Sequence, residues 1–354
     1  MVRKKVCVIK GDDASPEVVL PTVKILEGMK LGIEFLWPVT GAEGIQKNGN
    51  PFSPEAKKAV DEADCTLFGS ARSMESGLGY LRWGKKTYAN FRPVKWMKGM
   101  RTPLKNPEGI DFVVIRENLE GLYPGREGDI ERLEPLKLTD YITGQALNTS
   151  MKGKFAVRVI TEENTRNIAK ASCDLAIKRK AKGGKGKVTV SSKYNMLRQS
   201  DELFRRIVEE TVRYYPELTF EQQVIDNFCQ QMIIHPQQFD VVVMPNEHGD
   251  VMADGAAGLV GGLGLAPSAC FGKNYAYFEP VHGTAPDLKG KNIINPTAMI
   301  LSASWMLEYL GLKEAAQRLE RAVYEVYNEG KYLTPDQGGH SSTAEFCKAV
   351  SEKL

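Results

Sequence analysis

Short apolar runs alternate with longer amphipathic stretches along most of this chain. The runs favour strands at residues 6–10, 65–70, 111–118, 155–161, 187–193 and 239–245. Helix start signals open stretches near Ser15, Ser53, Thr161 and Ser200. The helix from Thr161 should run to about Lys180, and Pro21 should kink the first helix. Two more helices are expected at 296–310 and 313–329, with Gly311 and Gly330 as stops. This alternation predicts an α/β fold.

Residues 126–154 interrupt the alternation. The segment is charged, rich in turn residues and threonine, and has no helical periodicity. A structureless loop of this length is uncommon inside a compact domain. We therefore interpret it as an arm that pairs with another surface, and expect that surface to belong to a second subunit.

The composition narrows the class of protein. With 354 residues, of which 42% are hydrophobic and 26% charged, the chain is typical of an enzyme with two domains or one elaborated domain. A net charge of +3 is too small to indicate a nucleic-acid partner. No signal sequence is recognised and the Gly-rich stretch 255–270 is too short to span a bilayer, so we expect no membrane partner. Six scattered cysteines without a CxxC pair indicate buried thiols in a reducing cytoplasm and argue against zinc.

Asp250 and Asp254 carry the strongest indication of chemistry. If their segment is helical, the spacing of four residues places both carboxylates on one face. Two acids so close repel each other unless a cation lies between them, and hard oxygen ligands favour Mg²⁺ or Mn²⁺. The alternative is a solvated acidic helix face. The pair follows the buried run at 239–245, where α/β enzymes place ligands, and this favours a metal.

One expected motif is absent. A Rossmann dinucleotide site requires GxGxxG between the first strand and helix, but that turn reads KGDDASPEV at 10–18. The Gly-rich run at 258–264 lies in a predicted helix without a ribose-binding acid at the right distance. A bound nucleotide must therefore be held in another way.

Four segments together resemble one protein family. They are RPVK at 92–95, VIRENLEGLYPG at 114–125, SSKYNML at 191–197, and the block from IDNFCQQ at 225–231 through EPVHGTAPDLKGKNIINPTA at 279–298. The chain resembles the β-decarboxylating dehydrogenases, which include isocitrate, isopropylmalate, homoisocitrate and tartrate/malate dehydrogenases. The resemblance covers nearly the whole chain. These enzymes oxidise a 2-hydroxy acid with NAD(P)⁺ and then release the β-carboxylate as CO₂.

The resemblance implies a two-domain α/β fold with a mixed central sheet and a non-Rossmann nucleotide site. The large domain would combine residues 1–93 with 246–354. The small domain, residues 94–245, would carry the dimer contacts and the arm. The active cleft would lie between the domains and be shared across a homodimer.

The resemblance also assigns the catalytic centre. In the family, the residue that matches Asp226 comes from a partner subunit and joins those that match Asp250 and Asp254 around a divalent ion. Tyr123 and Lys193 match a catalytic pair, in which the tyrosine protonates the enolate carbon and the lysine, contributed across the dimer, relays the hydroxyl proton. A nearby ammonium would favour the phenolate form of the tyrosine.

Substrate binding is assigned to three arginines and two smaller side chains. Arg82, Arg92 and Arg116 match arginines that bind substrate carboxylates, for which guanidinium forks are suited. Asn195 matches an asparagine beside the substrate or nicotinamide, and Ser76 matches a substrate-binding serine of isocitrate enzymes. Taken alone, each arginine would more often be a surface ion pair.

The cofactor assignment depends mainly on one loop. The residues that the resemblance assigns to the cofactor are Asn246, Glu279, His282, Gly283, Thr284, Ala285, Pro286, Asp287, Leu288 and Asn295. The loop would wrap the adenosine, with Asn295 contacting adenine. Asp287 can accept hydrogen bonds from a ribose 2′-OH and repel a 2′-phosphate, whereas NADP-dependent relatives tend to carry Lys-Tyr at 287–288. NAD is therefore the expected cofactor.

Two segments depart from the family pattern. GDDASPEV stands where GDGIGPEV is usual, so two glycines are lost. The loop from Gly69 to Arg82, which selects the third group of the substrate, is shorter than in typical relatives. Counted back from Arg82, Ser76 matches isocitrate enzymes but Leu78 matches isopropylmalate enzymes.

RENLEGLY, in place of the RELTGGIY pattern frequent in isopropylmalate enzymes, favours isocitrate as the substrate. Isopropylmalate and homoisocitrate stay open as alternatives with the same chemistry. A silent regulatory subunit is a further alternative, but it predicts loss of Tyr123, Lys193 or a metal acid, and all are present.

Overall fold

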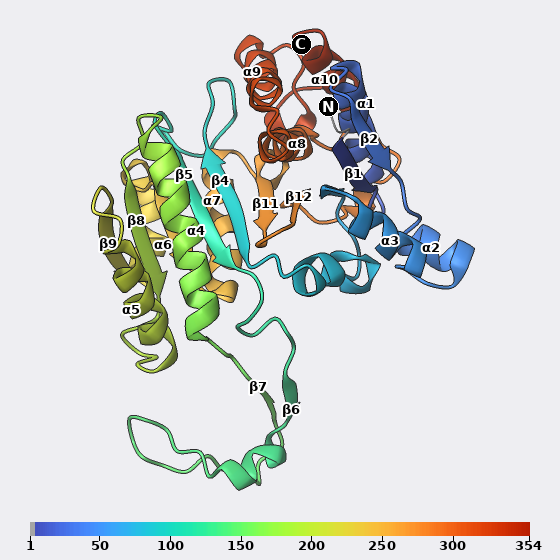
Figure 1. Cartoon of the computed structure of the whole chain (residues 1–354). Helices are drawn as coiled ribbons and strands as arrows, with labels where there is room; N and C mark the ends of the chain where they lie inside the picture. The colour runs from blue at the N-terminus through green and yellow to red at the C-terminus, as the bar shows by residue number, and fades with distance from the viewer. Residues whose placement is uncertain (1–3) are drawn as a thin grey trace.

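The computed structural model describes residues 4–354 (Figure 1). The strands are β1 (Lys4–Ile9), β2 (Ile33–Leu36), β3 (Cys65–Phe68), β4 (Ala89–Lys95), β5 (Asp111–Glu117), β6 (Glu127–Asp129), β7 (Lys154–Ala156), β8 (Lys187–Ser192), β9 (Thr219–Val224), β10 (Val241–Met244), β11 (Pro267–Phe271) and β12 (Ala276–Pro280). The α-helices are α1 (Pro16–Gly28), α2 (Gly41–Asn48), α3 (Pro54–Glu62), α4 (Glu162–Lys180), α5 (Ser200–Val212), α6 (Ile225–Ile234), α7 (Asn246–Val260), α8 (Thr297–Tyr309), α9 (Lys313–Glu329) and α10 (Thr343–Ser351).

Ten strands form one mixed sheet in the order β2-β1-β3-β12-β11-β4-β5-β10-β8-β9. The outer groups are parallel within themselves, whereas β11 pairs antiparallel with both β12 and β4, and β4 pairs antiparallel with β5. The two parallel groups therefore run in opposite directions on either side of the central strands. This confirms the expected α/β fold with a mixed central sheet.

Alternate side chains of the buried strands face two different layers of helices. Val113 of β5 and Val241 of β10 face the cluster that contains α1, α4, α5, α8 and α9. Phe112 and Val242, one residue away, face the cluster formed with α6 and α7. In Figure 1, α4 and α5 accordingly lie in front of this half of the sheet and α6 and α7 behind it.

Local start and stop signals are confirmed at most helices. Thr161 caps α4 by accepting from the Asn164 amide, and Ser53 caps α3 by accepting from Ala56. α9 has the expected bounds and ends at Gly330 in the left-handed conformation. α1 begins at Pro16 as expected, but the Ser15 hydroxyl makes no capping bond.

The strand expected at residues 155–161 is largely wrong. Only Lys154–Ala156 pairs as β7, and beyond it a single bridge joins Val159 to Gly121. Arg158, in the middle of the expected strand, turns its guanidinium to Asp201 and Glu247. These contacts fix the segment as an irregular connection into α4.

The expected arm is present at residues 126–154. It leaves the body of the molecule through the antiparallel pair β6–β7 and carries a 3-10 turn at Ile130–Leu136 (Figure 1). Apolar side chains are exposed along it, namely Leu136, Leu138, Tyr141, Ile142, Leu147 and Met151. An apolar extension of this kind fits an intermolecular contact.

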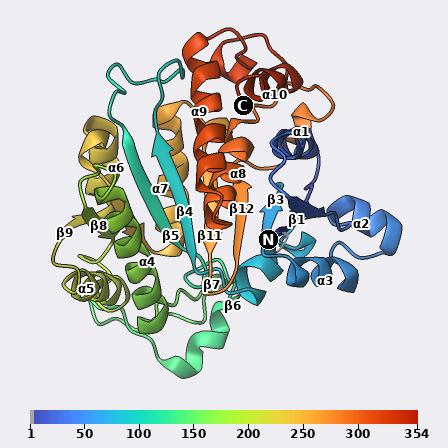
Figure 2. The same ribbon diagram turned by 45° about the horizontal axis from the view of Figure 1, so that its top comes forward.

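The two halves of the sheet are seen together in Figure 2, where α7 lies behind β4 and β5. Ala253, Leu259 and Val260 of α7 share a core with Phe112 and Phe228. α7 therefore packs with the central segment of the chain. The division into two domains itself stays a prediction.

Five of the six cysteines are buried, and Cys229 is partly exposed. Burial raises the pKa of the Cys7 thiol to about 12, so this group is inert at neutral pH. Among residues 4–354, the helices lack the combination of length and hydropathy that crossing a bilayer requires.

Candidate functional site

Asp250 and Asp254 lie one turn apart on α7, on the face that meets β4, as their spacing predicts. The Arg92 guanidinium lies between them, with Nη2 2.9 Å from Asp250 and Nη1 2.9 Å from Asp254. Burial raises the pKa of Asp254 against the opposing effect of Arg92, and the neighbouring Asp250 raises it further. An arginine thus supplies the cation that this pair requires.

Two of the three candidate arginines contact this pair, Arg92 from β4 and Arg116 from β5, and Arg82, from the turn at Tyr80–Gly84, lies near Arg116. Arg82, Arg92 and Arg116 are all buried. Burial lowers the pKa of Arg116 to about 10, and Arg92 and Arg82 lower it further while Asp250 opposes them. Three buried guanidiniums repel one another, and a bound anion would offset this repulsion. The cluster is therefore suited to bind an anion strongly.

Unused donors remain within the arginine cluster. The Nε groups of Arg82 and Arg92 are buried without a hydrogen-bond partner. Burial raises the pKa of the Glu279 carboxyl on β12. Arg82, Arg92 and Arg116 each oppose this rise. Glu279 thus partly balances the cluster, and the free Nε donors fit an incoming polycarboxylate.

Tyr123 lies at the open side of the same site. Its ring is 5.2 Å from the Arg116 guanidinium, and 41% of the residue is exposed. Partial burial raises the pKa of Tyr123, and Asp250 raises it further while Arg116 opposes both. Within one chain, the expected lysine partner is engaged elsewhere.

Lys193 follows β8, and its Nζ donates to Asp226 of α6 across 2.6 Å. The ammonium holds the pKa of the Asp226 carboxyl below its usual range. Among residues 4–354 of a single chain, no three metal-binding side chains of the His, Cys, Asp or Glu type gather.

A buried acid that the sequence did not reveal positions the Lys193 turn. Asp201 is fully buried at the start of α5 and accepts from the Lys193 backbone amide across 2.9 Å. Arg158 joins this carboxylate to Glu247, in the first turn of α7. The network connects the Lys193 turn to the helix of Asp250, whereas Asn195, in the same turn, is exposed.

The predicted nucleotide loop follows β12 and is fixed to two other loops. Ser70 Oγ donates to the His282 carbonyl across 2.6 Å, and the Ala14 amide donates to the Thr284 carbonyl across 3.0 Å. Ala285 adopts a left-handed φ of 47°, after which residues 286–288 form a 3-10 turn. Because β1, β3 and β12 are parallel to one another, these three loops meet at one edge of the sheet.

This loop has the features of a nucleotide site. His282 Nε2 is buried without a partner, and burial lowers the pKa of this imidazole. The space beside Gly283 is open, and Asp287 is exposed in the 3-10 turn. An unsatisfied donor or acceptor beside open space fits a bound cofactor.

Two of the expected cofactor side chains are already engaged within the protein. The Asn295 amide donates to Asp336 across 2.9 Å and to Tyr327 across 3.1 Å. Asn246 accepts from Arg116 across 2.9 Å and donates to the Glu120 carbonyl. The side chains of Asn295 and Asn246 are therefore bound within the protein, and the cofactor contacts assigned to them stay predictions.

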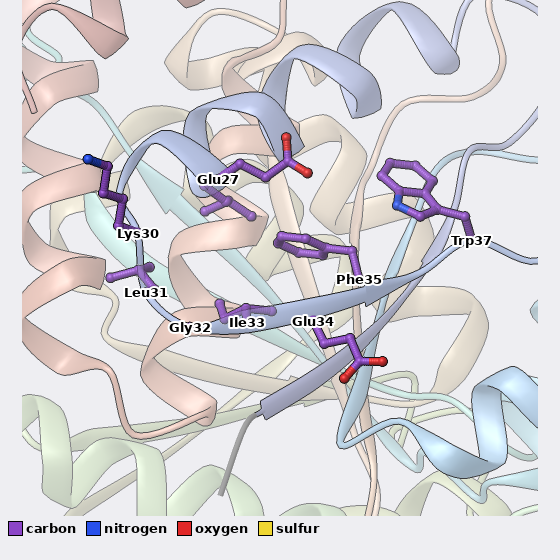
Figure 3. A pocket seen from close by; sticks show the side chains of 9 residues that line it. Glu27, Lys30, Leu31, Gly32, Ile33, Glu34, Phe35 and Trp37 are labelled. Atoms are coloured by element: carbon purple, nitrogen blue, oxygen red, sulfur yellow. The ribbon is translucent and has the colours of Figure 1, made fainter. Parts of the chain in front are cut away.

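The shortened loop before Arg82 places Ser76 in a 3-10 turn at Met74–Ser76, where it is buried. Leu78 and Tyr80 pack against the core cluster that includes Phe68. The apolar side chains of this loop thus serve the core rather than the site. A separate surface pocket, lined by Phe35 and Trp37 at the edge strand β2, includes none of the candidate residues (Figure 3).

Comparisons with known proteins agree with this geometry. The sequence profile described as isocitrate/isopropylmalate dehydrogenase matches residues 5–350. The chain belongs to this family. A 3-isopropylmalate/3-methylmalate dehydrogenase of Methanocaldococcus jannaschii is 42% identical over 99% of this chain and 98% of its own length. An isocitrate/homoisocitrate dehydrogenase of Thermus thermophilus is 37% identical over 99% of this chain and 98% of its own.

The fold comparison gives the same family. The crystal structure of isocitrate dehydrogenase from Methylococcus capsulatus superposes with a TM-score of 0.85, at 33% identity, covering 99% of each chain. The expected fold and family are therefore confirmed. The protein is a decarboxylating dehydrogenase that acts on a small hydroxy acid.

Proposed function

We propose that this protein catalyses the NAD-dependent, Mg²⁺- or Mn²⁺-assisted oxidative decarboxylation of isocitrate to 2-oxoglutarate and CO₂. The observation that carries the proposal is the cluster of three buried arginines, of which Arg92 and Arg116 pair with Asp250 and Arg92 also pairs with Asp254. A tricarboxylate chelated to a divalent ion needs both cationic forks and acidic metal ligands.

The chain supplies each role from its own residues. Arg82, Arg92 and Arg116 bind and orient the substrate carboxylates. Asp250 and Asp254 hold the metal together with a third carboxylate, Asp226 of a second copy. When bound, the ion would act as a Lewis acid on the substrate.

Two side chains handle the protons. In its uncharged form, the Lys193 amine accepts the proton of the substrate hydroxyl during oxidation and passes it on. Tyr123 donates its phenolic proton to the carbon that loses CO₂. Partial burial and Asp250 raise the pKa of Tyr123, so this chain holds the phenol protonated and ready to donate.

The loop at 282–288 supports NAD as the hydride acceptor. His282 contributes an unpartnered ring nitrogen, and Gly283 leaves room for a sugar or base. Asp287, exposed in the 3-10 turn, is suited to a ribose 2′-OH and repels a 2′-phosphate.

The substrate assignment depends on the loop before Arg82. Because Leu78 and Tyr80 pack into the core, they are not placed to line an apolar subsite for an isopropyl group. Ser76 offers a hydroxyl to a third carboxylate. The alternatives are 3-isopropylmalate, for which the Methanocaldococcus relative is named, and homoisocitrate, for which the Thermus relative is named.

We further propose a homodimer in the cytoplasm as the working form. Within a single chain Lys193 and Asp226 pair with each other and not with Tyr123 or Asp250. A second copy would bring its own Lys193 and Asp226 to complete each site, and the apolar arm at 126–154 is suited to join the copies.

A substrate-by-cofactor matrix tests the proposal. Isocitrate, 3-isopropylmalate and homoisocitrate are each assayed with NAD and NADP, with Mn²⁺ and with EDTA. The expected result is the highest kcat/KM for isocitrate with NAD and Mn²⁺. A higher kcat/KM for 3-isopropylmalate would make that acid the substrate in place of isocitrate. Turnover without NAD or NADP would overturn the reaction class.

A further inference from the structure

One ion pair joins two of the three loops that frame the nucleotide site. Asp13, which follows β1, accepts from Arg72 Nε across 2.7 Å, and its second oxygen accepts from Nη2 of the same guanidinium. The next residue, Ala14, donates its amide to the Thr284 carbonyl of the loop after β12 across 3.0 Å. The Asp13 side chain is 2% exposed.

Asp13 has a φ of 53°, the left-handed region that L-residues adopt at a cost, and the family pattern carries glycine there. A glycine would adopt this turn without strain. Aspartate is one of the few other residues that populate this region, so its carboxylate can be placed here at a modest cost.

The Arg72 backbone is fixed by a hydrogen bond, whereas its side chain is largely exposed although it is paired with Asp13. Its backbone amide donates to Asp12 across 3.0 Å, and Asp12 also accepts from Ala42 at the start of α2. The Arg72 side chain, by contrast, is 61% exposed. The guanidinium can therefore leave Asp13 without opening the core or moving the loop that carries it.

The charges around this point suit a phosphate. Arg72 lowers the pKa of Asp13 most strongly, and Lys289 contributes in the same direction, so both cations lie near the Thr284 segment. A dinucleotide pyrophosphate carries two negative charges, and this chain has no glycine-rich phosphate loop to bind them. Arginine forks are suited to phosphate oxygens.

We propose that Arg72 is a phosphate ligand of this protein, released from Asp13 to bind the pyrophosphate of the dinucleotide cofactor. Asp13 then acts as a positioning residue that stores the guanidinium beside Thr284 while the site is empty. The inference rests on the proposed use of NAD, and it concerns Arg72, to which the family resemblance assigns no role.

Calorimetric titration with ADP, adenosine and NAD tests this without turnover. ADP contains the pyrophosphate and adenosine does not. Arg72→Gln should weaken ADP and NAD binding roughly tenfold or more and leave adenosine unchanged, because charge-assisted bonds to phosphate are lost. Asp13→Asn, which keeps a side chain tolerated at positive φ, should leave ADP binding unchanged or make it tighter.

Arg206→Gln on α5 is the matched control, since Arg206 is an exposed arginine paired with Glu210 at 2.7 Å. It should bind ADP as the wild type does. Equal weakening by Asp13→Asn and Arg72→Gln would show a structural tie only, and unchanged ADP binding in Arg72→Gln would overturn the proposal. If the wild type bound neither ADP nor NAD, the proposed cofactor would fail instead.

Discussion

The Lys193 ammonium and the Asp226 carboxylate form a 2.6 Å ion pair between the end of β8 and the first turn of α6. The Asp226 side chain is 66% exposed, so the pair lies on the surface of the chain. Tyr123 and Asp250 lie in the arginine site without this pair. Under the proposed function these groups are two parts of one catalytic centre, which two copies would combine.

Mixing two inactive variants tests whether the site is shared. Tyr123→Phe and Lys193→Met should each be nearly inactive alone. After subunit exchange, a heterodimer holds one site with both wild-type residues. Random pairing in a two-fold dimer then restores about a quarter of the wild-type activity. The measurement is NAD reduction before and after exchange through mild denaturant.

The control pair is Tyr123→Phe with Asp250→Asn, since both residues belong to the same half of each site. That mixture should stay inactive, because neither site in the heterodimer is intact. Recovery in the control, or none with Lys193→Met, would contradict a site shared across subunits.

Arg92→Gln should reveal the acid pair as a metal site. Without the guanidinium, Asp250 and Asp254 repel each other, and the metal-free protein should lose about 1–3 kcal/mol of stability. A divalent ion can then take over the role of Arg92. We expect Mn²⁺ to raise the Tm of Arg92→Gln more than that of the wild type, measured against EDTA.

Asp254→Asn serves as the comparison, because it removes one ligand while α7 stays intact. Its Tm should respond little to Mn²⁺. If Mn²⁺ leaves the Tm of all three proteins at the EDTA value, these acids do not bind a metal in the free protein.

The parts of the fold that local signals determine could be predicted from the sequence. α4 and α9 begin and end as expected because their caps and stops are local. The central strands β4, β11 and β12 were not assigned, since their mixed polarity reflects the site they carry and their pairing is antiparallel between two parallel groups. Such an arrangement depends on contacts far apart in sequence.

The site could be predicted as a set of residues but not as a network. Family resemblance gave Arg82, Arg92 and Arg116, and the structure brings them together. The Arg92 bridge between the two acids and the buried Asp201 below Lys193 depend on three-dimensional packing. For Asp13, the lost glycine was the only available signal.

Glu117 should make stability depend on pH. Burial raises the pKa of this carboxyl to about 7, from 4.5 for an exposed glutamate. The contribution of protonated Glu117 to the free energy of unfolding is therefore fully present below pH 4.5. It is lost as the pH rises to about 7, and the free energy of unfolding falls by up to about 1.4 kcal/mol per pH unit. Glu117→Gln should lack this loss. The free energy of unfolding of the variant, minus that of the wild type, should therefore increase between pH 5 and 7. Urea unfolding at each pH gives both values.

Glu325→Gln controls for the change in charge, since Glu325 is exposed on α9. Its unfolding free energy should follow the wild-type pH profile. Parallel profiles for Glu117→Gln and the wild type would show that the buried carboxyl does not titrate in this window.

The arm at 126–154 should hold two copies together. Ile142 is 77% exposed there, and burying such a side chain contributes about 1.5–3 kcal/mol, doubled by two-fold symmetry. Ile142→Asp should therefore weaken the dimer at least roughly a hundredfold and lower activity at nanomolar protein, without changing the circular dichroism spectrum. Tyr214→Asp is the control, because Tyr214 is 80% exposed beyond α5. Light scattering gives the mass of each variant. A monomeric wild type, or an Ile142→Asp dimer as stable as that of the wild type, would show that the arm does not join the copies.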